Sequence, residues 1–475
     1  MTGTSIAGER LHVHFIGIGG ISMSGLARIL AARGHRVSGC DQKPSPIVEA
    51  LRADGLQVAI GHDPRHLEGV DLVVYTAAIR PDQPELAAAR TRNLPVMERA
   101  VLLGEVASSY SVCVAVAGTH GKTTTTGMIG LVLTEAGLDP TISLGGELAQ
   151  IGGNVRLGGD RIFLTEACEY VESFLRLTPT VAVILNIEPD HPDFFRDLAH
   201  LRGAFARFAG LVPEDGRIVA RTELPNVAEA VAGARAPVIT FGEGPGADFT
   251  ARDVRFDGRG LPSFVPVVRG RPMARMTLAV PGFHNVINAL AALAAADALG
   301  VAPEEAAAAL GKYGGTKRRF ERKGSYAGAE IVDDYAHHPT EVRATLAAAR
   351  NCPYKRIWCV FQPHTYTRTA SLLEEFARAL CLADRVIVTD IYAAREVDDG
   401  RVHARDLVRR LEELGGEALY LPSFDAVAAH LAANARPGDL ILTMGAGDIG
   451  RIGEMLLARE PSPRSDRGEG PCSIC

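Results

Sequence analysis

Short apolar runs alternate with helix-length segments along almost the whole chain. A run at His12–Ile16 is followed by the glycine-rich Gly17–Gly20 and by a segment with helical periodicity at Ser24–Arg33. A second run at Arg36–Gly39 then ends near Asp41. Because parallel strands joined by crossover helices produce this alternation, the sequence predicts an α/β protein with mostly parallel sheets.

The alternation restarts twice and so divides the chain into three blocks. Polar residues near Ser108 end the first block, and the strand-like run Val112–Ala117 opens the second, whose later part, Phe249–Val280, has the pattern of β-structure. One core usually serves about 100 to 200 residues, so a chain of 475 residues is long enough for three domains. We expect domains at residues 1–108, 109–313 and 314–459, and a disordered polar tail at 460–475.

Composition and charge exclude several classes of partner. The net charge of -6 comes without a dense Lys/Arg tract, so no nucleic-acid partner is expected. No segment has the pattern of a signal peptide or a membrane span, which predicts a cytoplasmic protein with no membrane partner. The eight cysteines are scattered and suggest reduced core residues. Cys472 and Cys475 have metal-like spacing but lack the second pair that a zinc site needs.

A phosphate-binding motif is the strongest chemical signal. The segment Gly118-Thr-His-Gly-Lys-Thr-Thr124 lies directly between a buried strand and a helix. Backbone N–H groups of such a loop and the helix N-terminus can hold phosphates. Lys122 would neutralise the β- and γ-phosphates of ATP, and Thr123 would bind Mg²⁺. A chance Gly-Lys-Thr in a glycine turn is the alternative interpretation.

Two further segments offer ligands for that metal. Glu169, in Glu166-Ala-Cys-Glu169, and His191, in Asn186-Ile-Glu-Pro-Asp-His191, each follow a predicted strand. Open parallel sheets bind ligands at the carboxyl ends of their strands, and hard cations prefer oxygen ligands. We therefore predict Mg²⁺ ligation by Thr123, Glu169 and His191. A solvated carboxylate or a capping Asp190 would be the structural interpretation of either segment alone.

The first glycine-rich loop leaves two functions open. Gly17, Gly19 and Gly20, with Asp41 after the next strand, approximate a dinucleotide-binding fingerprint, although Ser22 replaces its third glycine. The loop therefore suits a nucleotide diphosphate and does not require NAD.

Taken in order, the motifs resemble those of the Mur ligase family over about Leu11–Leu457. They are GTHGKTTTT, EACEYVESFL, NIEPDH, PGFHNVINALAA, RRFERKG, DDYAHHPTEV and FQPHTYTRT. The resemblance implies a Rossmann-like N-terminal domain, a central P-loop ATPase domain and a Rossmann-like C-terminal domain. Within the family, the last two motifs point to the branch that acts in peptidoglycan synthesis by joining L-alanine to UDP-N-acetylmuramate through an acyl phosphate. Cell-wall biogenesis, cell shape and cell division are the processes that this implies.

The resemblance also implies roles for individual residues. The UDP-substrate would contact Gly17, Gly19, Gly20, Asp41 and Thr76. ATP would contact Gly118, Thr119, His120, Gly121, Lys122, Thr123, Thr124, Asn285, Arg319 and Asp334. Lys122, Glu169, His191 and His338 would be catalytic, and His364 and Arg368 would bind the alanine carboxylate. The substrates would be UDP-N-acetylmuramate, ATP and L-alanine, with Mg²⁺ as cofactor, and the protein would be a monomer or a weak homodimer.

Three alternatives remain at this point. A murein tripeptide ligase shares several of the motifs and differs in the amine that it accepts. A nicotinamide-dependent dehydrogenase would explain the first glycine-rich loop but leave the phosphate loop without a role. A nucleotide-dependent switch would bind ATP without joining an amine.

Overall fold

The structure is a computed structural model, and it describes residue 6, residue 8, residues 10–77 and residues 79–459. The predicted tail at 460–475, with Cys472 and Cys475, lies outside the described residues. Contacts group the chain into two compact units, Met1–Phe320 with Ala347–Pro353 and Glu321–Leu346 with Tyr354–Cys475. The first unit contains two large sheets and a small antiparallel one, and the second unit contains one sheet.

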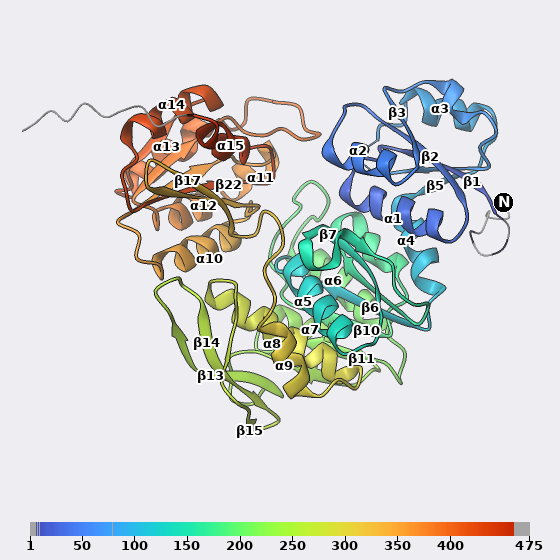
Figure 1. Cartoon of the computed structure of the whole chain (residues 1–475), viewed down its shortest axis with the longest axis horizontal. Helices are drawn as coiled ribbons and strands as arrows, with labels where there is room; N and C mark the ends of the chain where they lie inside the picture. Colours follow the sequence, from blue (N-terminus) through green and yellow to red (C-terminus); the bar gives the residue numbers. More distant parts are fainter. Residues whose placement is uncertain (1–5, 7, 9, 78, 460–475) are drawn as a thin grey trace, which may run out of the picture. The chain divides into compact units, whose positions relative to one another are not determined.

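The first sheet has five parallel strands in the order β3-β2-β1-β4-β5, seen at the blue end of the chain in Figure 1. The strand order reverses at β1, so the loop after β1 lies where this type of sheet binds nucleotides. The strands are β1 (His12–Ile16), β2 (Arg36–Asp41), β3 (Gln57–Ile60), β4 (Leu72–Tyr75) and β5 (Val96–Glu98). The helices are α1 (Ile21–Ala32), α2 (Pro46–Ala53), η1 (Pro64–Leu67), α3 (Pro84–Thr91) and α4 (Arg99–Ser108).

The second sheet has seven strands in the order β12-β11-β10-β6-β9-β7-β8, and β8 pairs antiparallel with β7. The strands are β6 (Val112–Ala117), β7 (Thr141–Leu148), β8 (Gly153–Arg156), β9 (Ile162–Ala167), β10 (Val181–Ile184), β11 (Arg217–Ala220) and β12 (Val238–Thr240). The helical segments are α5 (Lys122–Glu135), η2 (Ala149–Ile151), η3 (Tyr170–Arg176), α6 (Leu198–Gly210), α7 (Pro225–Val231), α8 (Phe283–Ala298) and α9 (Pro303–Leu310). The β-rich segment expected before α8 is an antiparallel sheet of β13 (Phe249–Phe256), β14 (Pro262–Val268), β15 (Arg271–Pro272) and β16 (Met276–Thr277).

The sheet of the second unit has the order β17-β18-β22-β19-β20-β21, and only its edge strand β17 is antiparallel. The strands are β17 (Glu321–Tyr326), β18 (Ala329–Asp334), β19 (Arg356–Phe361), β20 (Arg385–Val388), β21 (Ala418–Tyr420) and β22 (Asp439–Met444). The helices are α10 (Pro339–Arg350), α11 (Tyr366–Ser371), α12 (Leu373–Leu380), α13 (Ala404–Glu413), α14 (Phe424–Asn434) and α15 (Arg451–Leu457). The predicted α/β class with mostly parallel sheets is confirmed.

Side chains on the two faces of the central strands build separate cores. Phe163 and Leu164 are neighbours on β9, yet they belong to different buried clusters, because successive side chains of a strand point to opposite faces. The cluster around Phe163 continues to Phe15 of the first sheet, and the cluster around Leu164 includes Leu290 of the Ala-rich helix α8. Among the described residues, no helix is long and apolar enough to cross a bilayer.

Close packing of α4 on η3 generates a stability prediction. A Cβ atom at Gly104 of α4 would lie 2.2 Å from the carbonyl oxygen of Arg176, the last residue of η3. The methyl group added in Gly104→Ala would therefore push the backbones of α4 and η3 apart. Overpacking of this kind typically costs about 1 to 3 kcal/mol. The thermal midpoint, followed by circular dichroism, should fall by several degrees. Gly210→Ala in α6 is the matched control, since no atom lies within 4 Å of its Cβ position, and it should leave the midpoint unchanged or raise it. Equal midpoints for the two variants would contradict the packing argument.

Candidate active site

The phosphate-loop motif forms the connection between β6 and α5. Gly118 has φ 143° and Gly121 has φ 82°, and a Cβ atom at either position would lie within 3 Å of another residue, Leu185 or Asn288. Both positions therefore require glycine, because each combines a positive φ with a neighbour that leaves no room for a Cβ atom. The helix begins at Lys122 with no acidic residue in its first turn, which leaves its N-terminus suited to an anion.

A second loop, which follows β10, holds the phosphate loop in shape. Asn186 Oδ1 accepts a hydrogen bond from the His120 N–H at 2.8 Å, and its backbone oxygen accepts one from Thr119 at 3.1 Å. Thr119 Oγ1 in turn accepts from the Glu188 N–H at 2.9 Å. Sequence reasoning treated Asn186 only as the start of a motif and missed this positioning role. The signal was its place, directly after a strand that pairs with β6.

Lys122 is held by a buried carboxylate and two carbonyl groups. Its Nζ lies 2.8 Å from Glu169 Oε2 and donates to the backbone oxygens of Gly118 and Thr119 at 2.5 and 3.2 Å. Burial is the largest single influence and would lower the pKa of this ammonium group, but the charge and hydrogen bond of Glu169, together with the charges of Cys168 and Glu166, outweigh burial and raise the pKa. The side chain is therefore a fixed cation beside the phosphate loop.

Thr123 contacts a carboxylate that was not among the predicted site residues. Its hydroxyl donates to Glu166 Oε2 at 3.0 Å. That Thr123 and Glu169 share one metal ion stays a prediction. The other carboxylate oxygen of Glu166 accepts from the Gly145 N–H at 2.6 Å. Glu166 is thus a candidate site residue that sequence reasoning passed over within the Glu-Ala-Cys-Glu motif that it had singled out.

Glu169 lies instead with Asp190 and His191. The ligand atoms of these three residues all lie within 4.8 Å of one another, and His191 Nε2 is 3.7 Å from an oxygen of each carboxylate. Two carboxylates, both less than one-tenth exposed, match the oxygen preference of Mg²⁺, although an imidazole is an unusual ligand for that ion. Thr123 and Glu166 form a second pair of oxygen-bearing side chains, so both groups offer the kind of ligand that Mg²⁺ prefers.

Backbone strain accompanies these ligands. Val171, Glu172 and His191 have φ values of 48°, 55° and 53°, in the left-handed region that L-residues with side chains rarely adopt. Such residues cost roughly 1 to 3 kcal/mol each and persist where the surrounding structure fixes them, often at functional sites. Hydrogen bonds from Glu172 N to Glu169 O and from Phe174 N to Cys168 O, both 2.9 Å, fix this turn.

The first glycine-rich loop brings together the residues predicted to bind the UDP-substrate. The N–H of Gly17 donates to Cys40 O at 2.8 Å, and the N–H of Gly19 donates to Asp41 Oδ2 at 2.9 Å. A Cβ atom at Gly17 would lie 3.9 Å from Thr76 Cγ2, which places Thr76 beside the same loop. Gly20 closes the turn by donating to Gly17 O at 3.2 Å.

Asn285 is linked to the phosphate loop through Asn288, and the backbone of Arg319 is bonded to Thr316. Asn285 Oδ1 accepts from Asn288 Nδ2 at 3.1 Å, and Asn288 is the residue that a side chain at Gly121 would strike. Arg319 donates its N–H to the backbone oxygen of Thr316 at 3.1 Å, and a Cβ atom at Gly146 would meet both Thr316 and Thr123. Asn288 was not among the predicted site residues.

The second unit gathers the remaining candidates at the carboxyl ends of its strands. Arg368 of α11 is 5 % exposed, and its Nη1 lies 3.2 Å from His364 Nδ1. Burial, followed by the charges of His337 and Arg368, lowers the pKa of His364 to about 3, so its imidazole is neutral at pH 7. The His337 ring lies 5.8 Å from the His364 ring.

Asp334 and His338 belong to the same unit. Asp334 Oδ1 accepts from the Ala336 N–H at 2.7 Å, and both side chains are about 5 % exposed. Their predicted roles toward ATP concern the phosphate loop, which lies in the other compact unit. A second glycine-rich segment, Gly445–Gly450, serves packing, since a Cβ atom at Gly447 would lie 2.2 Å from Gln362 Oε1.

Three family models match the chain in succession. The Mur ligase family catalytic domain matches residues 12–111, the Mur ligase middle domain residues 116–296 and the Mur ligase glutamate ligase domain residues 318–447. The UDP-N-acetylmuramate–L-alanine ligase of Acetivibrio thermocellus is 51% identical over 447 residues, covering 94% of this chain and 95% of that protein. The ligase of the same name from Caldanaerobacter subterraneus is 47% identical, covering 94% of this chain and 97% of its own length.

Solved structures agree with these relatives. The UDP-N-acetylmuramate-alanine ligase of Thermotoga maritima superposes with a TM-score of 0.81 at 29% identity, covering 94% of this chain and 98% of that one. A murein peptide ligase from Psychrobacter arcticus gives 0.73 at 27% identity, with 96% and 100% coverage. With the family models spanning most of its length and relatives of about half-identical sequence, this chain belongs to the Mur ligase family and is a ligase.

Proposed function

We propose that this ligase joins L-alanine to the carboxylate of UDP-N-acetylmuramate, with ATP as the co-substrate. One observation carries the proposal. Lys122 is held against Glu169 in a strand-to-helix phosphate loop, in a chain 51% identical over 94% of its length to a ligase named for this reaction. The products would be the amide, ADP and phosphate.

We propose three domains, with boundaries at residues 1–108, 109–313 and 314–459, that mainly bind the UDP-substrate, ATP and the amino acid, respectively. The loop of Gly17, Gly19 and Gly20, with Asp41 and Thr76, would hold the UDP group. ATP would lie on Gly118–Thr124, with Asn285, Arg319 and Asp334 as further contacts. His364 and Arg368 would receive the carboxylate of alanine, since a guanidinium group matches a carboxylate with two parallel hydrogen bonds. We further propose a cytoplasmic protein that is a monomer or a weak homodimer.

The first chemical step is attack of the substrate carboxylate on the γ-phosphate of ATP. An anion attacking a polyanion is opposed electrostatically, so fixed positive charge is the main requirement. Lys122 meets this requirement because it is charged and largely buried. Thr123 with Glu166, and Glu169 with His191, would hold Mg²⁺, which when bound supplies further positive charge to the phosphates.

The second step is attack of the alanine amine on the acyl phosphate. The amine must be neutral to act as a nucleophile. We propose that His338, which is buried directly before α10, lies beside the amine in this step. His364 is neutral because burial lowers its pKa, so it can accept from Arg368 without repelling it.

A single assay separates this activity from its rivals. Phosphate release is measured with UDP-N-acetylmuramate, ATP and, in turn, L-alanine, L-serine, glycine and the tripeptide that murein peptide ligases add. Release that depends on L-alanine supports the proposal, and release that depends only on the tripeptide would assign the chain to the murein ligase branch. ATP hydrolysis without any amine requirement would support a nucleotide switch, and binding of NADH in a fluorescence titration would support a dehydrogenase.

Lys122→Ala should reduce ligation by several orders of magnitude and leave UDP-substrate binding nearly intact. The lysine is predicted to act on the phosphates of ATP, and the UDP loop is built from other strands. Phosphate release and calorimetric binding of UDP-N-acetylmuramate are the two measurements. Activity retained within about tenfold, equivalent to some 1.4 kcal/mol, would remove Lys122 from the phosphate-binding role.

Glu169→Gln and Glu166→Gln test the metal assignment as a pair. Each change keeps the shape of the side chain and removes a negative oxygen ligand, so the Mg²⁺ concentration for half-maximal activity should rise severalfold in both. Glu223→Gln, a carboxylate bound to Arg221 outside the site, is the matched control. A Mg²⁺ titration that shifts for Glu166→Gln alone would give Glu169 a purely electrostatic role beside Lys122.

Arg368→Lys tests the alanine site. Lysine keeps the charge but not the planar group that grips a carboxylate at two points, so the KM for L-alanine should rise roughly ten- to a hundredfold, as for loss of a charge-assisted hydrogen bond. The KM values for ATP and UDP-N-acetylmuramate should stay within about twofold. A raised KM for ATP with an unchanged KM for alanine would move Arg368 to the nucleotide site.

A further inference from the structure

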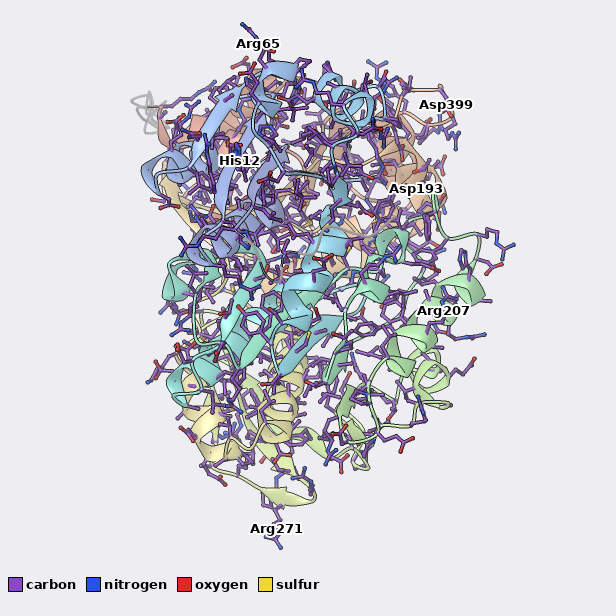
Figure 2. The ribbon with its side chains drawn as sticks, turned by 90° about the vertical axis from the view of Figure 1, so that its right-hand side faces the viewer. His12, Arg65, Asp193, Arg207, Arg271 and Asp399 are labelled. Carbon is purple, nitrogen blue, oxygen red and sulfur yellow. The ribbon has the colours of Figure 1, made fainter. Side chains whose placement is uncertain are left out.

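A group of polar side chains lies buried beneath the first sheet. Along β1 the residues alternate, with Val13 and Phe15 in the large core and His12 and His14 on the other face. That face is otherwise packed with apolar side chains, among them Ile16, Leu67, Val73, Leu86 and Ala89. Figure 2 shows His12 among the strands, whereas Arg65 of η1 projects at the outer edge. The polar group therefore lies between the sheet and the helices η1 and α3.

Four metal-binding side chains converge there, and none has a role in the proposed reaction. The ligand atoms of His14, Cys40, His66 and Glu85 all lie within 4.8 Å of one another. Glu85 is the centre of the group, with Cys40 Sγ 2.6 Å from its Oε2 and His66 Nδ1 2.6 Å from its Oε1. His14, Cys40 and Glu85 are each at most 1 % exposed.

His14 Nε2 is a buried atom with no hydrogen-bond partner among the described residues. Glu85 Oε1 lies 3.9 Å away, beyond hydrogen-bond reach. An unpaired buried polar atom normally marks a role that the protein alone does not satisfy.

A chain of hydrogen bonds fixes which nitrogen of His14 carries the proton. Gly69 O can only accept, so His12 Nδ1, 2.8 Å away, must donate to it. When His12 carries a single ring proton, its other nitrogen accepts a hydrogen bond from the Ser38 hydroxyl, at 2.9 Å. The hydroxyl oxygen, 2.9 Å from His14 Nδ1, then accepts a hydrogen bond from His14. In this arrangement the lone pair of His14 Nε2 faces the carboxylate of Glu85.

We propose that His14, Cys40, His66 and Glu85 bind a divalent transition-metal ion of the zinc class. Two imidazoles, a thiolate and a carboxylate are ligands that Zn²⁺ takes in tetrahedral sites. On binding, the thiol of Cys40 loses its proton to solvent and a sulfur–metal bond replaces its hydrogen bond to Glu85. The Ser38–His12–Gly69 chain is the outer shell that holds the ligand nitrogen of His14 in place.

Only small movements are needed for an ion to enter. Ligand atoms about 2.0 to 2.3 Å from zinc in a tetrahedron lie roughly 3.3 to 3.6 Å apart. The distance of 3.9 Å from His14 Nε2 to Glu85 Oε1 is slightly too long for this geometry. The distances of 2.6 Å from Cys40 Sγ to Glu85 Oε2 and from His66 Nδ1 to Glu85 Oε1 are about 1 Å too short, so the Glu85 side chain must move when an ion binds. His62, 3.2 Å from Cys40 Sγ, borders the group.

Cobalt binding to the full chain is the test. Protein purified without a metal-affinity tag is stripped with a chelator and titrated with Co²⁺, whose bond to a thiolate gives a charge-transfer absorption band. We expect one equivalent of Co²⁺ to produce that band, displacement of the Co²⁺ by Zn²⁺, and a zinc dissociation constant below about 1 µM. Zinc should also raise the thermal midpoint, since a metal that binds only the folded state stabilises it.

Cysteine variants identify the thiolate that produces the absorption band. Cys40→Ser should abolish it and remove the zinc-dependent rise in thermal midpoint. Cys113→Ser, a buried cysteine on β6, is the matched control and should keep both, as should the double substitution Cys472→Ser with Cys475→Ser. His14→Ala should weaken zinc binding at least tenfold.

Two results would overturn the proposal. Wild-type protein that gives no thiolate–cobalt band would show that the four side chains form a metal-free hydrogen-bond network, and this result stands even where a variant fails to fold. A band that persists in Cys40→Ser would place the metal elsewhere, for example at Glu169 and His191 with a neighbouring cysteine.

Discussion

The ion pair between Lys122 and Glu169 is the contact on which the candidate site depends. Taking two charges out of water is unfavourable unless the pair is close and its remaining groups are hydrogen-bonded. Lys122 satisfies this condition with the backbone oxygens of Gly118 and Thr119, and those same bonds fold the phosphate loop around its nitrogen. The loop and the cation therefore form as one structure, and an incoming phosphate meets charge that is already in place.

The strand order of the central sheet explains why three motifs far apart in sequence meet. β6 lies between β10 and β9, and all three are parallel, so the segments after them open at the same edge. Those segments are the phosphate loop, the turn that carries Glu169 and the loop from Asn186 to His191. The left-handed residues Val171, Glu172 and His191 lie in two of these segments, which is where strained backbone is expected to occur at a functional site.

The elements predicted best are those whose apolar runs are continuous. β1 at His12–Ile16 and β6 at Val112–Ala117 match their expected limits, because both are buried and are followed by a glycine loop. The edge strands β3 at Gln57–Ile60 and β17 at Glu321–Tyr326 were not predicted, since they are polar and largely exposed and carry little periodicity. The interior strands β7, β11 and β18 were not predicted either, whereas the edge strand β21 was. Short strands of four to eight residues carry too few positions for the local pattern to identify all of them.

The same limit applies to the site. The phosphate loop is a local motif, and sequence alone placed its residues together. The hydrogen-bond partner of Thr123 could not be identified from the sequence. Distinguishing Glu166 from Glu169 requires knowing in which direction each side chain points at the end of β9. The group around Glu85 has no spacing signature at all. Its members come from β1, β2, η1 and α3, and only the fold brings them together.

Cys40 ties the buried group to the candidate substrate loop. Its backbone oxygen accepts the N–H groups of Gly17 and Ile18 at 2.8 and 3.0 Å, while its side chain points beneath the sheet toward Glu85. The next residue, Asp41, points to the opposite face and accepts from Gly19, as alternation along a strand requires. The backbone oxygen of Cys40 thus binds the glycine loop, while the Cys40 side chain is held by Glu85 beneath the sheet. Any contact that fixes the Cys40 side chain, whether a carboxylate or a metal ion, also fixes the loop that would receive the nucleotide.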